Sequence, residues 1–270
     1  MGTAGTGGFS NYGSSIGAFN SATIDAIITF FMVLFGINFA LFYRVLVGGW
    51  RDALRSEELH WYLALFAGST LFVSLMILPQ YGTFLNALRY GSFQVATIMS
   101  TTGYATTDFN LWPQAVKALI VVLMFVGSCA GSTAGGIKVV RIGILCKLGR
   151  REVRHTFQPR KVQVVRFEGK GVEENRLTQV AVFFFVYVLL VLVGMFLVSL
   201  EGLYDLETNF TAALTCISNV GPGLGHAGPV ENFSGYGPFA KVVLSMLMLA
   251  GRLELFPILV LFHPSVWRKG

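Results

Sequence analysis

Long apolar stretches and short polar connectors alternate along the whole chain. A helix that crosses a bilayer needs about 20 predominantly apolar residues. Two apolar stretches, Phe84–Thr101 and Leu206–Val220, are shorter, and each leads into a segment that contains glycine. Their length alone allows either a complete crossing or a re-entrant hairpin. Five other stretches are long enough to cross, approximately Ile24–Val47, Leu59–Pro79, Pro113–Gly149, Leu177–Leu200 and Tyr236–His263.

The positions of the basic residues decide between these alternatives. The connectors 44–58 and 150–175 are both rich in Arg and Lys, and such connectors face the cytoplasm. Both lie on that side only if Phe84–Thr101 enters the membrane and turns back. Two segments lie on the same side of a membrane only if an even number of crossings separates them. The basic end at 268–269 should also face the cytoplasm, and this requires Leu206–Val220 to be re-entrant. The sequence therefore predicts an all-α membrane protein whose repeating unit is span, re-entrant helix with loop, and span.

Composition supports membrane residence and excludes several classes of function. The chain is 54% hydrophobic and only 13% charged, whereas soluble domains carry about 25% charged residues. Most of the basic residues lie between Lys138 and Arg176, as in a cytoplasmic loop, and we expect no nucleic-acid partner. The cysteines and histidines show neither CxxC nor HExxH spacing. No apolar span pairs two aspartates, or a serine with a histidine, at depth, so we expect no enzymatic activity.

The repeating unit divides the chain into two copies and part of a third. We expect a third repeat at 51–150, a cytoplasmic basic connector at 151–175 and a fourth repeat at 176–270. Residues 1–50 resemble the later part of a second repeat, as though its first half were missing. Each unit contains one glycine turn before a span, and ordinary glycine-rich loops are the alternative explanation. The first, second and third glycine turns are Thr6-Gly7-Gly8, Thr101-Thr102-Gly103 and Asn219-Val220-Gly221.

These turns suit a cation. Glycine adopts positive φ without a Cβ penalty, so neighbouring carbonyls can point at one axis. A ring of carbonyls replaces the hydration shell of a permeating ion, as in potassium filters. The short helices before the turns would direct their partially negative C-terminal ends at the same place. No carboxylate lies within the turns, which favours a filter made of backbone carbonyls.

The stretch Pro113–Gly149 is too long for one span, since it would extend about 55 Å as continuous helix. Its middle carries Gly127, Gly131, Gly135 and Gly136, and glycine disfavours helix by about 1 kcal/mol per residue. We predict a break there, which we call the 127–136 loop. Close helix packing through the GxxxG spacing is an alternative. A phosphate-binding P-loop is a weaker one, because the Gly-Lys-Ser/Thr ending is missing.

The last span contains the charged segment Gly251-Arg252-Leu253-Glu254 near its middle. A charge at the centre of a bilayer costs about 2.5–3.5 kcal/mol on insertion scales, so each needs a partner or water. One alternative is that both charges reach the cytoplasmic interface. The other is that Arg252 bonds carbonyls of the 127–136 loop and holds a gate shut. Arg89 and Lys117 are expected to anchor the outer interface.

In combination, the glycine turns, the interrupted helix and the Gly-Arg-Leu-Glu segment resemble the Trk/Ktr/HKT superfamily of potassium transporters, and most closely its TrkH type. The resemblance covers the whole chain and implies four repeats around a quasi-fourfold pore. The three turns are similar to the second, third and fourth filter strands, so we expect a longer protein. The implied filter residues are Thr6, Gly7, Gly8, Thr101, Thr102, Gly103, Asn219, Val220 and Gly221. The implied gate residues are Gly127, Ser128, Cys129, Ala130, Gly131, Ser132, Thr133, Ala134, Gly135, Gly136 and Arg252.

The resemblance also implies a function and partners. It implies gated potassium uptake through a carbonyl filter at the bacterial inner membrane, with K+ as the transported ion and no organic cofactor. It implies a homodimer that sits on cytosolic nucleotide-binding regulatory subunits of the TrkA type. The basic connector could in addition contact anionic membrane lipid. A secondary transporter with broken helices, or a superfamily member that also passes Na+, remains an alternative.

Overall fold

The computed structural model describes residues 2–158 and 163–253, and these residues are mostly helical. A two-stranded hairpin, β1 (Arg166–Phe167) and β2 (Lys170–Gly171), lies between α7 and α8. Short 3₁₀ turns occur at Ser15–Phe19, Phe109–Leu111, Gly225–Ala227 and Phe233–Gly235. The helices are α1 (Ala22–Phe35), α2 (Phe39–Leu46), α3 (Trp50–Leu54), α4 (Glu57–Tyr81), α5 (Phe84–Met99), α6 (Gln114–Val126), α7 (Val139–Phe157), α8 (Glu174–Ser199), α9 (Leu206–Ser218) and α10 (Pro238–Arg252).

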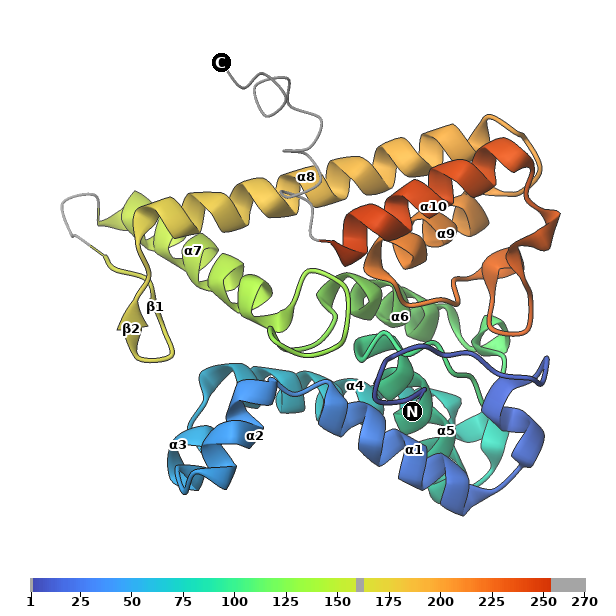
Figure 1. The fold of residues 1–270 in the computed structure, drawn as a ribbon, viewed down its shortest axis with the longest axis horizontal. Coiled ribbons are helices and arrows are strands. Elements are labelled where there is room, and N and C mark those ends of the chain that lie inside the picture. Colours follow the sequence, from blue (N-terminus) through green and yellow to red (C-terminus); the bar gives the residue numbers. More distant parts are fainter. Residues whose placement is uncertain (1, 159–162, 254–270) are drawn as a thin grey trace.

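Two helical units repeat along the chain, as the sequence predicts. In one, the short helix α5 packs against α4, α1 and α6; in the other, the short helix α9 packs against α8 and α10. Helix α6 also contacts α9 and so joins the two units (Figure 1). The predicted all-α membrane fold is confirmed. Helix α7 continues past residue 150, where we placed the start of the connector, to Phe157.

Contacts between distant connectors show that α5 and α9 are re-entrant. Lys147 of α7, just before the basic connector, forms an ion pair with Glu57 of the connector 44–58. On the opposite side, the loops that follow the second and third glycine turns meet, since Asn110 donates to the Gly225 carbonyl at 3.1 Å and accepts from the Gly225 amide at 2.9 Å. Helices α5 and α9, of 16 and 13 residues, are shorter than the span that a bilayer requires.

Two of the described helices, α4 and α8, are long and apolar enough to cross a membrane, and α1 with α2 would make a third if the bent pair is one span. Their outward faces carry exposed large apolar side chains, among them Phe30, Leu75 and Phe185. A surface of this kind is unfavourable in water and is typical of lipid contact. The last predicted span is helical from Pro238 to Arg252, and its remainder, including Glu254, lies outside the described residues.

The first predicted span, Ile24–Val47, is wrong as a single helix. The chain bends by 89° between α1 and α2. Asn38 caps α2 by accepting from the Ala40 amide at 2.9 Å. The backbone at the bend bonds to the 127–136 loop, from Phe39 N to Gly131 O and from Cys129 N to Gly36 O, both at 3.1 Å. The bend is thus stabilised by a loop that lies far away in the sequence.

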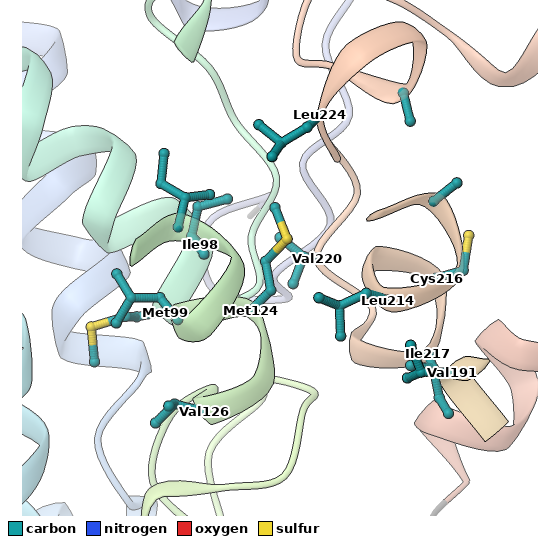
Figure 2. Close-up of a cluster of buried hydrophobic side chains, with 14 of the residues drawn as sticks. Ile98, Met99, Met124, Val126, Val191, Leu214, Cys216, Ile217, Val220 and Leu224 are labelled. Atoms are coloured by element: carbon teal, nitrogen blue, oxygen red, sulfur yellow. The ribbon is translucent and has the colours of Figure 1, made fainter. Parts of the chain in front are cut away.

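The two short helices form the centre of the molecule. Every residue of α5 from Phe93 to Met99 and of α9 from Thr211 to Ser218 is buried. Figure 2 shows that side chains from α5, α6 and α9 meet there, including Ile98, Met124 and Leu214. Because these helices are enclosed by protein, the turns at their ends are held in a fixed position.

Arg89 has a different role from the interfacial anchor that we expected. Its Nε donates to the buried carboxylate of Asp25 at 2.7 Å, which ties α1 to the pore helix α5. Asp25 is almost fully enclosed, so burial of its charge depends on this partner. The ion pair therefore stabilises the position of α5 relative to α1.

Asp25→Ala should lower the free energy of unfolding by about 3 kcal/mol, because it leaves the Arg89 guanidinium without its partner in a largely buried site. Thermal unfolding in detergent, followed by tryptophan fluorescence, measures the change. Asp52→Ala, at an exposed position of α3, is the control and should change stability by less than about 0.5 kcal/mol. Equal shifts for the two variants would contradict the assigned role of the ion pair.

Candidate functional site

The three glycine turns share one backbone conformation. In each, a non-glycine residue has left-handed φ, and the glycine two positions later has positive φ again. The φ values are 49° and 63° for Thr6 and Gly8, 53° and 85° for Thr101 and Gly103, and 55° and 108° for Asn219 and Gly221. Left-handed φ costs a non-glycine residue roughly 1–2 kcal/mol. Because this left-handed residue occurs at the same place in all three turns, specific contacts in each turn must stabilise it.

Backbone hydrogen bonds explain this conformation. Each turn closes with a bond from the residue after the left-handed one to a carbonyl five positions earlier, as in the Schellman ending of a helix. These bonds are Gly7 N to Gly2 O at 2.9 Å, Thr102 N to Thr97 O at 3.0 Å and Val220 N to Thr215 O at 3.0 Å. The negative ends of α5 and α9 are therefore directed at the glycine turns, which favours a cation there.

The turns lie side by side in chain order. A Cβ atom at Gly8 would clash with the Thr102 carbonyl oxygen, and one at Gly103 would lie 2.6 Å from the Val220 carbonyl oxygen. Each contact joins the glycine of one turn to the middle carbonyl of the next turn. The two contacts are equivalent, as expected if the turns surround a common axis. Glycine is required both by its positive φ and by this close approach.

A cavity of about 810 Å³ lies between the first and third glycine turns. Lys241 and Met248 of α10 also line it, together with Arg252. Gly8 and Gly103 instead form the contacts between neighbouring turns. The predicted filter residues that line the cavity are Thr6, Gly7, Thr102, Asn219, Val220 and Gly221.

The 127–136 loop is a closed, non-helical loop between α6 and α7. Backbone bonds at its base run from Ile137 N to Phe125 O at 3.2 Å and from Lys138 N to Val126 O at 3.0 Å. Gly127, Gly131 and Gly136 have positive φ. The alternative of GxxxG helix packing is excluded, because the segment is not helical.

The loop lies directly against the ends of both pore helices. The Gly135 amide donates to the Thr101 hydroxyl at 2.8 Å, and the Ser128 hydroxyl donates to the Met99 carbonyl at 2.7 Å. A Cβ atom at Gly135 would clash with the Ser218 carbonyl oxygen. The loop is thus held beneath the second and third glycine turns.

Arg252 reaches the same loop from α10. Its Nη1 donates to the Thr133 carbonyl at 2.9 Å. The Thr6 hydroxyl, whose shorter bond is to the Gly5 carbonyl at 2.8 Å, also lies 3.1 Å from the Thr133 carbonyl. Helix α10 comes close to α9 here, since a Cβ atom at Gly251 would clash with the Ile217 carbonyl oxygen. One loop carbonyl therefore links the first glycine turn to the charged end of α10.

A second cavity, of about 400 Å³, lies on the other side of the loop. Loop residues Gly131 to Gly136 line it, together with Lys138, Arg141 and Arg252. Arg252 lines both cavities.

Sequence reasoning missed two side chains that hold the loop. Glu58, in the first turn of α4, is buried, and its Oε1 accepts from the Ala130 amide at 2.6 Å. Asn38 donates to the other carboxylate oxygen at 3.5 Å. The available signal was a carboxylate at the start of an apolar span, where a free charge would be unfavourable.

Oxygen atoms dominate the chemistry of this site. The glycine turns offer backbone carbonyls and the threonine hydroxyls, which suit a hard cation. In the described residues, no group of three or more His, Cys, Asp or Glu side chains could hold a metal ion. Re-entrant helices that end in repeated turns of backbone carbonyls are typical of membrane proteins that transport cations.

Comparison with known proteins agrees with this class. The family model of the TrkH cation transport proteins matches residues 78–269, and the chain belongs to this family. The resemblance found in the sequence is thus confirmed. As in other members, the chain is a multi-pass protein of the bacterial inner membrane.

Several relatives are similar over nearly all of this chain. The Trk system potassium uptake protein TrkH of Salmonella typhimurium is 35% identical, with 99% of this chain and 55% of that protein covered. TrkG of Escherichia coli K12 is 31% identical with the same coverage. The crystal structure of the potassium transporter TrkH from Vibrio parahaemolyticus matches with a TM-score of 0.92 at 32% identity, covering 99% of this chain and 57% of that one. The chain spans about half the length of the curated relatives it matches.

Gly103→Ala should disrupt the second glycine turn, because the new methyl group would meet the Val220 carbonyl at a φ of 85°. In the full-length protein we expect rubidium flux into proteoliposomes to fall about tenfold, which corresponds to about 1.4 kcal/mol. Gly68→Ala is the matched control, since a Cβ atom there meets no atom within 4 Å. Unchanged flux for Gly103→Ala would exclude this turn from the ion path.

Proposed function

We propose that this chain forms most of the pore wall and the gate of a potassium uptake protein. The observation that carries the proposal is the position of Arg252, which bonds the Thr133 carbonyl of the loop and lines both the 810 Å³ and the 400 Å³ cavities. The glycine turns would bind the ion, and the loop with Arg252 would close the path. The relatives named as potassium uptake proteins support K+ as the transported ion.

The electrostatics of the site support a cation path with a positive barrier. The carbonyl ends of α5 and α9 attract a cation at the glycine turns. A guanidinium directly beyond them repels the same ion, and repulsion is strong where water is scarce. A closed state held by Arg252 would therefore combine a physical block with a charge barrier.

Opening requires the loop to leave this position. The Thr133 carbonyl would lose the bonds from Thr6 and Arg252. The loop glycines with positive φ would allow the backbone to adopt another conformation. The bonds at the base of the loop, from residues 137 and 138, need not break. We infer that the tip of the loop moves while its base remains in place.

We propose that a fourth turn completes the ring on the side where the 810 Å³ cavity separates the first and third turns. The matched relatives are about twice as long as this chain, which leaves room for such a unit. We also propose a homodimer that is controlled by a cytosolic nucleotide-binding subunit of the TrkA type. Mass photometry of the full-length protein tests the assembly, and a single monomer mass with and without the regulator would contradict it.

Anionic lipid is a further proposed partner. Between α7, the hairpin and α8 lies a cavity of about 910 Å³, lined by apolar Ile144 and Phe183 and by basic Arg141, Lys170 and Arg176. This combination suits a phosphate headgroup with its acyl chains. Native mass spectrometry should show retention of phosphatidylglycerol over phosphatidylcholine, and equal retention would contradict the proposal.

Arg252→Gln should raise basal rubidium flux in the full-length protein about tenfold, because it removes a charge-assisted hydrogen bond and the charge barrier together. Lys241→Gln is the matched control, since Lys241 lies on the same helix and lines the same 810 Å³ cavity. Its own bond, to the Ser234 carbonyl, is remote from the loop. Flux that stays at or below the wild-type level in Arg252→Gln, at normal expression, would refute the gate.

A further inference from the structure

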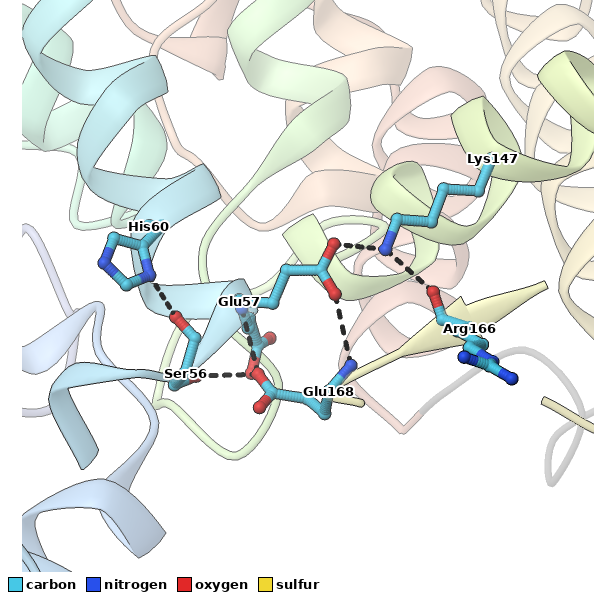
Figure 3. A network of polar contacts seen from close by, with 7 residues as sticks. Ser56, Glu57, His60, Lys147, Arg166 and Glu168 are labelled. Atoms are coloured by element: carbon cyan, nitrogen blue, oxygen red, sulfur yellow. Dashed lines mark hydrogen bonds and ion pairs between the residues drawn. The ribbon is translucent and has the colours of Figure 1, made fainter. Parts of the chain in front are cut away.

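The hairpin β1–β2 contacts the first turn of α4 through Glu168, which lies at the tip of the hairpin. The carboxylate of Glu168 accepts hydrogen bonds from the Ser56 hydroxyl at 2.7 Å and from the Glu58 amide at 3.0 Å (Figure 3). The Glu168 amide in turn donates to the Glu57 carboxylate at 3.2 Å. Three consecutive residues of one connector thus bind one residue of the other.

Lys147 of α7 strengthens this junction. Its ammonium group donates to the Arg166 carbonyl at 2.7 Å and forms an ion pair with Glu57 (Figure 3). The body of the hairpin is fixed by Val165 and Phe167, which are buried against α7 and α8. The hairpin therefore connects α8, of one repeated unit, to α4, of the other.

The contact with α4 has a specific physical effect. The first amides of a helix lack acceptors within the helix. Ser56 accepts from the Leu59 amide at 3.4 Å, and Glu168 supplies an acceptor for the Glu58 amide from a distant part of the chain. A carboxylate at this end also interacts favourably with the helix dipole. Glu168 therefore stabilises the first turn of α4 in its present position.

The same turn of α4 holds the 127–136 loop. The backbone amide of Glu58 binds the hairpin, and its buried side chain accepts from the Ala130 amide at 2.6 Å. A displacement of this turn would move both groups together, because they belong to one residue. The hairpin and the loop are thus joined through Glu58.

We propose that Glu168 is a positioning residue for the gate: by capping α4 it fixes Glu58, and through Glu58 it holds Ala130 and the 127–136 loop. This proposal rests on the gate function proposed above. Glu168 itself is exposed and lies outside the ion path. Removal of its carboxylate loosens the loop and favours the open state.

The test uses Glu168→Ala in the full-length protein, with hydrogen exchange of peptides that cover 56–60 and 128–136, and with rubidium flux. Both regions should exchange about tenfold faster, the change expected from loss of a hydrogen bond to a charged group, and basal flux should rise. Glu168→Gln should behave almost as wild type, since an amide oxygen still accepts from Ser56 and Glu58. Glu173→Ala is the control, because its carboxylate pairs with Arg176 of the same segment.

Ser56→Ala provides a second variant, which removes one of the two donors to the Glu168 carboxylate and also the acceptor of the Leu59 amide at the start of α4. It should shift exchange of 128–136 in the same direction. Faster exchange confined to the hairpin, with 128–136 unchanged in both variants, would overturn the positioning role.

Arg252→Gln separates the two proposals: if it raises flux while Glu168→Ala leaves loop exchange unchanged, the gate stands and the positioning role fails. If loop exchange rises but neither variant raises flux, the positioning role stands and the gate fails.

Discussion

A backbone amide or carbonyl outside a helix has no water to bond at membrane depth. The 127–136 loop meets this constraint through groups that other elements supply. Its Gly135 amide bonds the Thr101 hydroxyl, its Ala130 amide bonds Glu58, and its Thr133 carbonyl accepts from Arg252. The break in the long helix is possible because these partners surround it. The Arg252 contact also joins α10 to the loop, and two further backbone bonds of the loop, at Gly131 and Cys129, stabilise the bend between α1 and α2.

The sequence predicted the elements that are determined by residues close together in the chain. The apolar runs located α4 and α8 to within a few residues, and four closely spaced glycines located the break after α6. The re-entrant helices followed from charge, since only that topology places both basic connectors on one side. The three glycine turns were found as a motif, although their common left-handed residue was not.

Features that depend on distant partners could not be predicted from sequence. Gly36 and Asn38 mark a helix end and a helix start within one apolar stretch, but the local sequence does not show that Gly131 stabilises the bend. Asp25 and Arg89 are 64 positions apart, and Glu58 and Ala130 are 72 positions apart. A charged residue in an apolar stretch shows that a partner must exist, but its identity follows only from the packing of the helices.

The left-handed residues of the three turns have the same backbone and different side-chain contacts. The Thr6 hydroxyl donates to the 127–136 loop, and the Thr101 hydroxyl accepts from the same loop. The side-chain amide of Asn219 instead donates to the Met248 carbonyl of α10 at 3.2 Å. Equivalent positions around the axis are therefore not interchangeable. The ring can present nearly uniform oxygens to an ion and still be asymmetric on the side of the loop. If the 127–136 loop is the gate that we propose, a single non-repeated segment closes a path whose walls are built from repeats.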